Sequence, residues 1–383
     1  MIYLDYAATT PVDPQVLDAM LPWLREDFGN PASDHLLGRK ASAAVEQARA
    51  QVAVLLGATP EEIIFTSGAT ESNNLAIKGA LEFRGLKSAH VVTSRIEHKS
   101  VLDACRWLET QGARVTYLKP DAQGRISVEQ VIAALTPQTT LVSLMWVNNE
   151  IGVINEIEVL APMLRERGIL FHVDAVQAVG KLPIHLADVP VDLLSLSAHK
   201  FYGPKGMGAL FVRKRPRARL APQMHGGGHE QGMRSGTLAT HQIVGLGEAC
   251  RLAQQRIAED AQAMSALRDA LWQRLQALPK VHLNASEALR APHILNMSFE
   301  GVEGESLRAL LGDLAVSSGA ACSSATREPS FVLRALGRDD ELASASLRFS
   351  FGRDSTLAEV ETAAEKVSFA VGKLRALSPR WTE

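Results

Sequence analysis

Apolar residues recur along the N-terminal part of the chain at two spacings, one typical of helices and one typical of buried strands. Val16 to Arg25 and Leu36 to Leu56 carry the helical spacing, and Gly57 follows the second stretch as glycine often follows a helix. The short apolar run Ile63 to Thr66 predicts a buried strand, and Leu75 to Leu86 returns to helical spacing. An alternation of strands and helices therefore begins here.

The alternation continues toward the middle of the chain. Further strands are predicted near Val91, Val115, Val142, Leu170 and Leu194, with helical patterns near Val101, Val131 and Val159 between them. Strands that alternate with helices form a largely parallel sheet covered on both faces. One long helix is predicted from about Ile243 to Leu278, and shorter elements follow it. We therefore expect an α/β fold with a large domain over 14–256 and a smaller α+β domain built from 1–13 and 257–383.

Polar residues follow most of the predicted strands. They are Gly68-Ala69-Thr70 after the first strand, Glu97-His98 after the second, Asn148-Asn149-Glu150 after the fourth, Asp174 and Gln177 after the fifth, and Ser197-Ala198-His199-Lys200 after the sixth. Open sheets of this class bind ligands beyond the carboxyl ends of their strands. We therefore expect these residues to meet in one site.

Lys200 ends the segment that starts with the apolar run Leu193 to Leu196, and a glycine-rich loop follows it. This pattern presents one amine at a strand end. A lysine amine attacks carbonyl carbons only when burial or neighbouring cations keep it partly neutral. Taken alone, the pattern more commonly indicates an ordinary exposed lysine, because most lysines are solvated surface charges.

Two segments offer groups that suit a phosphate. Ser67 to Thr70 begins a helix with free backbone N–H groups and a hydroxyl, although serine and threonine are also ordinary helix caps. Ser197 and His199 lie close to Lys200, so a phosphate held by both segments would keep its carrier within reach of the amine. The segment from Gly226 to Thr237 adds a hydroxyl-bearing loop with an arginine, or is a plain surface loop.

Asp174 closes a predicted strand at a position where a carboxylate can meet a ring nitrogen, although aspartate after a strand is often only a turn former. A cofactor that needs a phosphate site, a lysine for a Schiff base and an acidic partner for a pyridinium nitrogen is pyridoxal 5'-phosphate. The combination with Lys200 indicates this cofactor more strongly than either residue alone.

Composition is typical of an ordinary globular protein. The chain has 383 residues, 46% hydrophobic and 21% charged, with a formal charge of −2, which argues against direct nucleic-acid binding. The basic run 213–219 lacks interleaved aromatic residues and predicts a solvated loop after a strand. No stretch reaches the length of a membrane span and the N-terminus lacks a signal peptide, so we expect a cytoplasmic protein without membrane contact.

The three cysteines differ in their surroundings. Their wide separation argues against a disulfide framework or a zinc site, and no metal site is predicted. Cys105 and Cys250 lie in helical patterns among apolar neighbours, as buried cysteines do. Cys322 lies in the small-residue run 317–326, which predicts a mobile loop with an accessible thiol.

Many ordered motifs resemble one known family nearly from end to end. They are Leu4 to Pro11, Phe28 to Pro31, Thr66 to Asn74, Glu97-His98-Lys99, Asn148 to Gly152, His172 to Gln177, Ser197 to Lys200, Arg234 to Thr237, Ser317 to Ser324, and Leu347 to Ser350. The chain resembles cysteine desulfurases of the class V aminotransferase group, most closely the housekeeping iron–sulfur-cluster type. This resemblance implies the fold type I of pyridoxal-phosphate-dependent transferases.

The resemblance also implies roles around the cofactor ring. Lys200 would bind pyridoxal 5'-phosphate covalently, and Asp174 would pair with its pyridinium nitrogen. His98 would stack on the ring, Gln177 would bond the phenolic oxygen, and Asn149 would lie near that oxygen.

For the phosphate, the resemblance implies a second set of residues. Ala69, Thr70, Ser197 and His199 would hold the phosphate within one subunit. Thr237 would complete the site of the neighbouring subunit in a homodimer.

The implied reaction converts L-cysteine to L-alanine. Arg348 and Asn149 would bind the substrate carboxylate, and the released amine of Lys200 would remove the Cα proton. The Cys322 thiolate would then take the substrate sulfur as a persulfide and pass it to an acceptor protein, such as an iron–sulfur scaffold. His98 is a candidate to assist ionisation of this thiol.

Several alternatives stay open at this point. The chain could be a selenocysteine lyase or another β-eliminating relative, a non-catalytic adaptor of a sulfur pathway, or a sulfur donor for DNA phosphorothioation. Two departures from the family pattern stand out: Ala32 replaces a serine, and the chain stops at Glu383, short of the tail with which longer members dock the scaffold.

Overall fold

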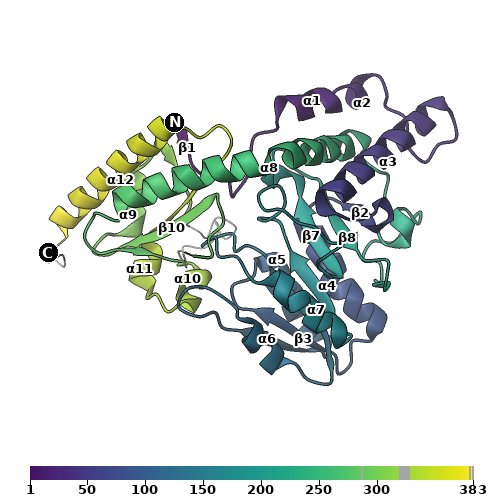
Figure 1. The fold of residues 1–383 in the computed structure, drawn as a ribbon, viewed down its shortest axis with the longest axis horizontal. Coiled ribbons are helices and arrows are strands. Elements are labelled where there is room, and N and C mark those ends of the chain that lie inside the picture. Colours follow the sequence, from purple (N-terminus) through teal and green to yellow (C-terminus); the bar gives the residue numbers. More distant parts are fainter. Residues whose placement is uncertain (286–287, 319–327, 379–380, 382–383) are drawn as a thin grey trace.

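A seven-stranded sheet forms the centre of the computed structural model, which describes residues 1–285, 288–318, 328–378 and 381 (Figure 1). In spatial order its strands are β2 (Ile63–Thr66), β8 (Gly208–Val212), β7 (Leu193–Ser197), β6 (Leu170–Asp174), β5 (Thr139–Met145), β3 (His90–Ser94) and β4 (Arg114–Leu118). All neighbours pair in parallel except β8, which is antiparallel to both β7 and β2. The expected largely parallel sheet is confirmed. β8 is reversed because the short segment 198–207 joins it to β7, and a parallel return needs a longer crossover.

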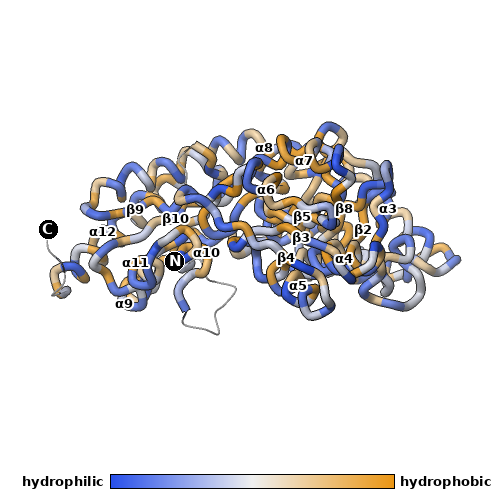
Figure 2. Tube along the Cα trace, turned by 90° about the horizontal axis from the view of Figure 1, so that it is seen from below, coloured by the Kyte–Doolittle hydropathy of each residue, from blue (hydrophilic) through white to orange (hydrophobic). Residues whose placement is uncertain are grey.

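Consecutive residues of the central strands point into two different cores. Leu141, Leu170 and Leu193 belong to a core beneath α4 (Ala69–Arg84) and α5 (Lys99–Thr110). Val142, Phe171 and Leu194, each one position later, belong to a core on the opposite face. The helices of that face are α3 (Leu36–Leu56), α6 (Val128–Ala134) and α7 (Ile157–Glu166). Figure 2 shows the hydrophobic strands between the helical layers.

The predicted helix from Val16 to Arg25 is instead two helices, α1 (Pro14–Met20) and α2 (Pro22–Arg25). Pro22 has no N–H group to continue the hydrogen-bond ladder of α1, so the pattern is interrupted there. The predicted end of α3 is confirmed, because Gly57 adopts the left-handed conformation with φ of 61°.

A second core lies around a three-stranded antiparallel sheet in the order β12 (Ser346–Ser350), β10 (Ile294–Phe299) and β9 (Val281–Leu283). Its helices are α9 (Gly304–Leu310) and α12 (Leu357–Leu377). The short helices α10 (Phe331–Ala335) and α11 (Asp340–Ser344) instead pack with Ile96, Ile151 and Val153 in a separate small cluster. The N-terminal strand β1 (Ile2–Tyr3) pairs in parallel with β11 (Leu314–Ala315), and Leu4 joins this core. Short 3₁₀ turns are η1 (Pro60–Glu62), η2 (Ala198–Lys200) and η3 (Glu230–Gly232).

One helix links the two cores. α8 (Thr240–Leu275) places Ile243 and Leu246 in the large core and Leu271 and Leu275 in the second core, as Figure 1 makes visible. The predicted long helix is confirmed with its boundaries about three residues earlier.

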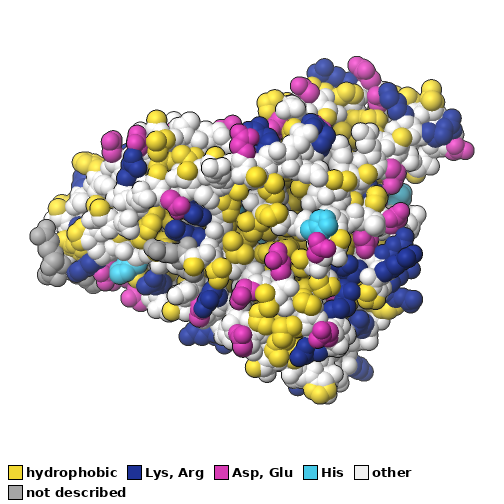
Figure 3. Space-filling view, in the orientation of Figure 1, with side chains coloured by type: hydrophobic (Ala, Val, Ile, Leu, Met, Phe, Trp, Pro, Cys, Tyr) yellow, Lys and Arg dark blue, Asp and Glu magenta, His cyan; other side chains and the backbone are white. Residues whose placement is uncertain are grey.

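The basic run after β8 is mostly solvated, and acidic and basic side chains are both spread over the face in Figure 3. The prediction is wrong for Arg213, whose half-buried guanidinium donates to the carbonyl oxygens of Val191, Leu186 and Val189 at 2.6–3.0 Å. Cys105 and Cys250 are buried as predicted, and burial raises the pKa of both thiols. Among the described helices, none combines the length and apolar character needed to cross a bilayer.

Candidate active site

The carboxyl ends of the central strands open onto a cavity of about 580 Å³. Its lining includes the predicted residues Ala69, Thr70, His98, Asn149, Asp174, Gln177, Ser197, His199, Lys200 and Arg348. The sheet therefore gathers in one place the residues that follow different strands, as expected from the topology.

Lys200 lies in η2, directly after β7, and is half-buried in the cavity wall. The alternative of an ordinary exposed lysine is therefore wrong. Its Nζ donates to the carbonyl oxygens of Ala7 and Ala8, both at 2.8 Å. The buried amine of Lys181 donates to the carbonyl oxygen of Lys200 at 2.5 Å, and burial together with the nearby Lys200 charge lowers the pKa of Lys181 to about 7. Lys200 is thus fixed at both its main chain and its amine.

Asp174 presents a carboxylate at the end of β6, held by two donors. Asn73 Nδ2 donates to Asp174 Oδ2 at 2.8 Å, and the Val176 N–H donates to Asp174 Oδ1 at 3.1 Å. Beneath it in the sheet, His172 is hydrogen-bonded to Ser143 and Ser195 at 2.8 and 3.0 Å, and burial lowers the pKa of His172 to about 3. A neutral, fully bonded layer therefore supports the Asp174 carboxylate.

Gln177 is held by two partners next to this carboxylate. Its Nε2 donates to the Ala7 carbonyl oxygen at 2.9 Å, and its Oε1 contacts His293 Nε2 at 3.0 Å. The side chain is therefore positioned by the N-terminal segment and by the second core together.

The first turn of α4 supplies the candidate anion site. Gly68 caps the helix with φ of 148°, a conformation that favours glycine, and a side chain there would still have room beside Ser197. The first N–H groups of a helix have no intrahelical partner and attract anions. His199 completes this wall, with its Nδ1 3.1 Å from Thr9 Oγ1. Burial and nearby Lys200 and Lys205 lower the pKa of His199 to about 4, so its ring is neutral near pH 7.

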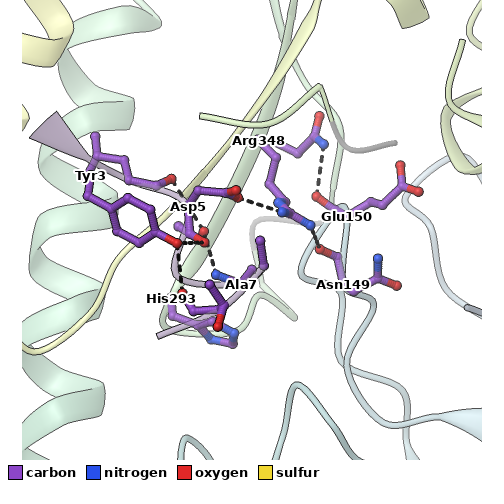
Figure 4. Close-up of polar contacts among 12 residues, drawn as sticks. Tyr3, Asp5, Ala7, Asn149, Glu150, His293 and Arg348 are labelled. Atoms are coloured by element: carbon purple, nitrogen blue, oxygen red, sulfur yellow. Dashed lines mark hydrogen bonds and ion pairs between the residues drawn. The ribbon is translucent and has the colours of Figure 1, made fainter. Parts of the chain in front are cut away.

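Arg348 comes to the cavity from β12 of the second core, and Figure 4 shows its guanidinium between Asp5 and Asn149. Its Nη2 donates to Asp5 Oδ1 at 2.7 Å and its Nη1 donates to the Asn149 carbonyl oxygen at 2.8 Å. Its Nε is buried and has no hydrogen-bond partner among the described residues. The guanidinium is therefore oriented in advance and keeps donor capacity for another carboxylate.

His98 caps the N-terminus of α5. The Ser100 N–H donates to His98 Nδ1 at 3.2 Å, and the Ser100 hydroxyl lies 2.8 Å from the same nitrogen. The ring is held by this edge and lines the cavity.

One predicted residue that the structure describes does not line this cavity. Thr237 is exposed on the chain and does not line it. Cys322 lies outside the described residues, as does the rest of 319–327.

Other lining residues were not singled out from the sequence. They are Ala7, Ala8, Thr9, Glu71, Met145, Val147, Val176, Lys205 and Gly206, whereas Ser67 and Gly68 lie in the predicted anion-binding segment. Ala7 to Thr9 had a sequence signal, because they lie in the motif 4–11, but strand-end reasoning does not reach a segment that precedes the sheet. Glu71 pairs with Arg234 at 2.7 Å and ties α4 to the glycine-rich loop.

No group of metal-ligating side chains gathers in the part of the chain that the structure describes. The donor set instead fits pyridoxal 5'-phosphate: an amine on Lys200, a carboxylate on Asp174 and an anion site at the start of α4. These features define an α/β enzyme site of the kind that binds this cofactor.

Comparisons with known proteins support the same class of enzyme. The aminotransferase class-V family model matches residues 2–362. The cysteine desulfurases IscS of Stutzerimonas stutzeri (strain A1501) and of Azotobacter vinelandii are each 58% identical over 383 residues, covering 99% of this chain and 95% of theirs. The chain belongs to the class-V aminotransferase family, in the group of the cysteine desulfurases.

Solved structures give the same result for the fold. A NifS-like protein superposes with a TM-score of 0.87 at 36% identity, covering 98% of both chains. A structure described as SspA in complex with cysteine has a TM-score of 0.83 at 40% identity, covering 93% of this chain and 100% of that one. The fold class expected from the sequence is confirmed.

Proposed function

We propose that this protein is a pyridoxal-phosphate-dependent cysteine desulfurase that converts L-cysteine to L-alanine and delivers the sulfur to acceptors in iron–sulfur cluster assembly or another thiolation pathway. The observation that carries the proposal is the position of the Lys200 amine in the same cavity as the Asp174 carboxylate and the N-terminus of α4. The 58% identity to proteins named cysteine desulfurase IscS supports the choice of substrate.

Bound pyridoxal 5'-phosphate supplies an electron sink for the substrate Cα. Asp174 would pair with the ring nitrogen and favour its charged form, with the carboxylate already oriented by Asn73 and Val176. Ala69, Thr70, Ser197 and His199, which line the cavity, would hold the phosphate, and His98 and Gln177 would hold the ring. The free amine of Lys200 takes the proton from the substrate Cα, guided by the carbonyl oxygens of Ala7 and Ala8 that hold Nζ.

Arg348 and Asn149 bind the substrate carboxylate. The position of Arg348 in the cavity wall beside Asn149 supports this role, because its planar guanidinium can donate further hydrogen bonds to a carboxylate. Asp5 and the Asn149 carbonyl oxygen keep the guanidinium plane fixed while the substrate binds.

Cys322 takes the sulfur. The substrate Cβ–S bond breaks and a bond from that sulfur to Cys322 Sγ forms, so cysteine and a thiol yield alanine and a persulfide with all atoms and electrons conserved. The described residues on either side of the Cys322 segment support transfer of the substrate sulfur to Cys322 near the cavity. Ser317 exchanges two main-chain hydrogen bonds with Arg348, at 2.7 and 3.2 Å, and Ser330 donates to Glu150 at 2.5 Å, next to Asn149.

The working form is proposed to be a homodimer in the cytoplasm, with Thr237 completing the partner's phosphate site and a sulfur-acceptor protein as the further partner. The exposure of Thr237, and the exposed apolar side chains of Phe28 and Leu36 at 72% and 75%, support association with a second copy. We also keep 14–256, and 1–13 with 257–383, as the proposed domains.

The test is to measure alanine from L-cysteine, selenocysteine and cysteine sulfinate with the purified, cofactor-loaded protein. We expect one alanine per sulfur released from L-cysteine in the presence of a thiol reductant. A Cys322→Ala variant should lose this reaction with L-cysteine while keeping the absorption of the bound cofactor. Full turnover of L-cysteine by that variant, or turnover of selenocysteine alone, would contradict the proposal.

A further inference from the structure

Glu97 is a completely buried acidic residue that the proposed reaction does not use. It follows β3 and directly precedes His98, which lines the cavity. Glu97 Oε1 accepts hydrogen bonds from Ser94 Oγ at 2.8 Å and from the Met145 N–H at 3.1 Å. Its Oε2 is buried and has no hydrogen-bond partner in the part of the chain that the structure describes.

Asp174 provides an internal comparison, because it is also a buried acid at a strand end. Both Asp174 oxygens accept a hydrogen bond, one from Asn73 and one from Val176. Burial strongly disfavours a carboxylate anion when one of its oxygens has no hydrogen-bond partner. A protonated carboxyl group avoids most of this desolvation penalty. The unpartnered oxygen therefore favours the neutral acid at Glu97.

The charged and titratable groups around Glu97 also favour its neutral form. Asp174 faces it from β6, and the Cys105 thiol faces it from α5. No ion pair to Glu97 is present among the described residues. Burial, with Asp174 nearby, raises the pKa of Glu97 to about 8.

We propose that Glu97 is a neutral carboxylic acid in the working protein and that in this form it positions His98 without adding a second negative charge beside Asp174. The turn between β3 and α5 is tied to the end of β5 at two points. Met145 donates to Glu97, and Asn148 Nδ2 donates to the Ile96 carbonyl oxygen at 2.9 Å. His98 follows directly, so these two bonds set where its ring lies against the ligand.

The first test compares unfolding of the cofactor-free protein and its Glu97→Gln variant in urea across pH. An unfolded glutamate loses its proton above about pH 4.3, whereas the folded protein keeps it up to a pKa of about 8. The wild type should therefore lose stability relative to the glutamine variant, by about tenfold in the unfolding equilibrium constant per pH unit between about pH 5 and pH 7.5. Glu365→Gln, an exposed change on α12, should give no such trend. Parallel pH profiles of wild type and Glu97→Gln would overturn the proposal.

The second test measures pyridoxal 5'-phosphate affinity and the absorption spectrum of the bound cofactor. Glutamine reproduces the shape of the neutral acid, so Glu97→Gln should bind within about threefold of wild type. Glu97→Ala removes the link to Met145 and should bind about tenfold more weakly, with an altered spectrum. Equal losses in both variants would overturn the proposal.

A third readout is the infrared band of a protonated carboxyl group. A band that titrates near the Glu97 pKa of about 8 is expected in the wild-type protein and should be missing from Glu97→Gln, which separates it from Glu150, whose pKa burial raises to about 7. The same band in both proteins, or in neither, would overturn the proposal. The unfolding and infrared measurements need neither substrate nor activity, so their outcome is separate from that of the desulfurase assay.

Discussion

The two sides of the cavity are built in different ways. On the inner side, polar groups at the ends of β5, β6 and β7 are held by partners from the same layer, such as Ser143 and Ser195 on His172. On the outer side, groups far apart in the chain hold one another. Asp5 accepts from Arg348 and the Ala7 N–H donates to Ser350 Oγ, each pair 343 residues apart.

This difference means that the two sides depend on different parts of the chain. Most of the inner side needs only the central sheet and α4. The outer side also needs the second core and the returning N-terminal segment, because Arg348 lies on β12 and Asp5 follows β1. Damage to the inner side should therefore impair cofactor binding, whereas damage to the outer side should mainly impair substrate binding and sulfur transfer.

The largest loss of activity is expected from replacing Lys200, whose amine lies where the two sides of the cavity meet. Lys200→Ala removes the amine held by Ala7 and Ala8, so alanine production should fall by about 10³-fold or more. The protein should still bind pyridoxal 5'-phosphate non-covalently, because Asp174 and the α4 N-terminus are intact. Initial rates and cofactor absorption measure both quantities, with exposed Lys87→Ala as the matched control. Undiminished turnover would rule out Lys200 as the base.

The next effect concerns acid stability of the inner side. The pKa of His172 is about 3 in the folded protein, whereas the reference value for the unfolded chain is 6.5. Between these two pH values the unfolded chain binds a proton at His172 and the folded protein does not. Stability should therefore fall as pH drops from about 6.5 toward 3, with about 4 kcal/mol lost through this residue. His172→Gln should flatten that part of the profile in urea unfolding. A profile as steep as that of wild type would show that another group causes the acid loss.

A smaller effect is expected on the outer side from Asp5→Asn. The change removes the anion that pairs with the buried Arg348 guanidinium and should lower the free energy of unfolding by about 2 kcal/mol. The Michaelis constant for L-cysteine should change, while affinity for pyridoxal 5'-phosphate stays within about threefold of wild type. A change in cofactor affinity as large as the change in the Michaelis constant would contradict the distinction between the two sides.

The smallest effect is expected from Ser330→Ala. Ser330 donates to the buried Glu150 and caps α10 through the Leu333 N–H, so its loss should cost about 1 kcal/mol of stability. Transfer of sulfur to Cys322 should slow several-fold without loss of cofactor. Thr362→Ala on the exposed side of α12 is the control, and a drop in cofactor affinity in the Ser330 variant alone would contradict this expectation.

The inner side could be predicted from the sequence because each residue directly follows an apolar run. Asp174, His98 and Lys200 need only the rule that parallel strands end at one edge. The N-terminal wall of Ala7 to Thr9 could not be derived this way, because its position depends on pairing of β1 with β11.

Other differences between the predicted and the observed structure have local causes. The break before Pro22 overrides a continuous helical pattern, and the reversal of β8 follows from the length of one loop. The partial burial of Arg213 depends on main-chain carbonyl groups that a pattern of side chains does not reveal.

The most direct test of the central claim is a single turnover with sulfur-labelled L-cysteine, followed by peptide mapping under non-reducing conditions. The account predicts one labelled sulfur on the peptide that contains Cys322, with one alanine formed per label, and no labelled peptide in the Lys200→Ala variant. Label on Cys105 or Cys250, or alanine formation without any protein-bound sulfur, would contradict it.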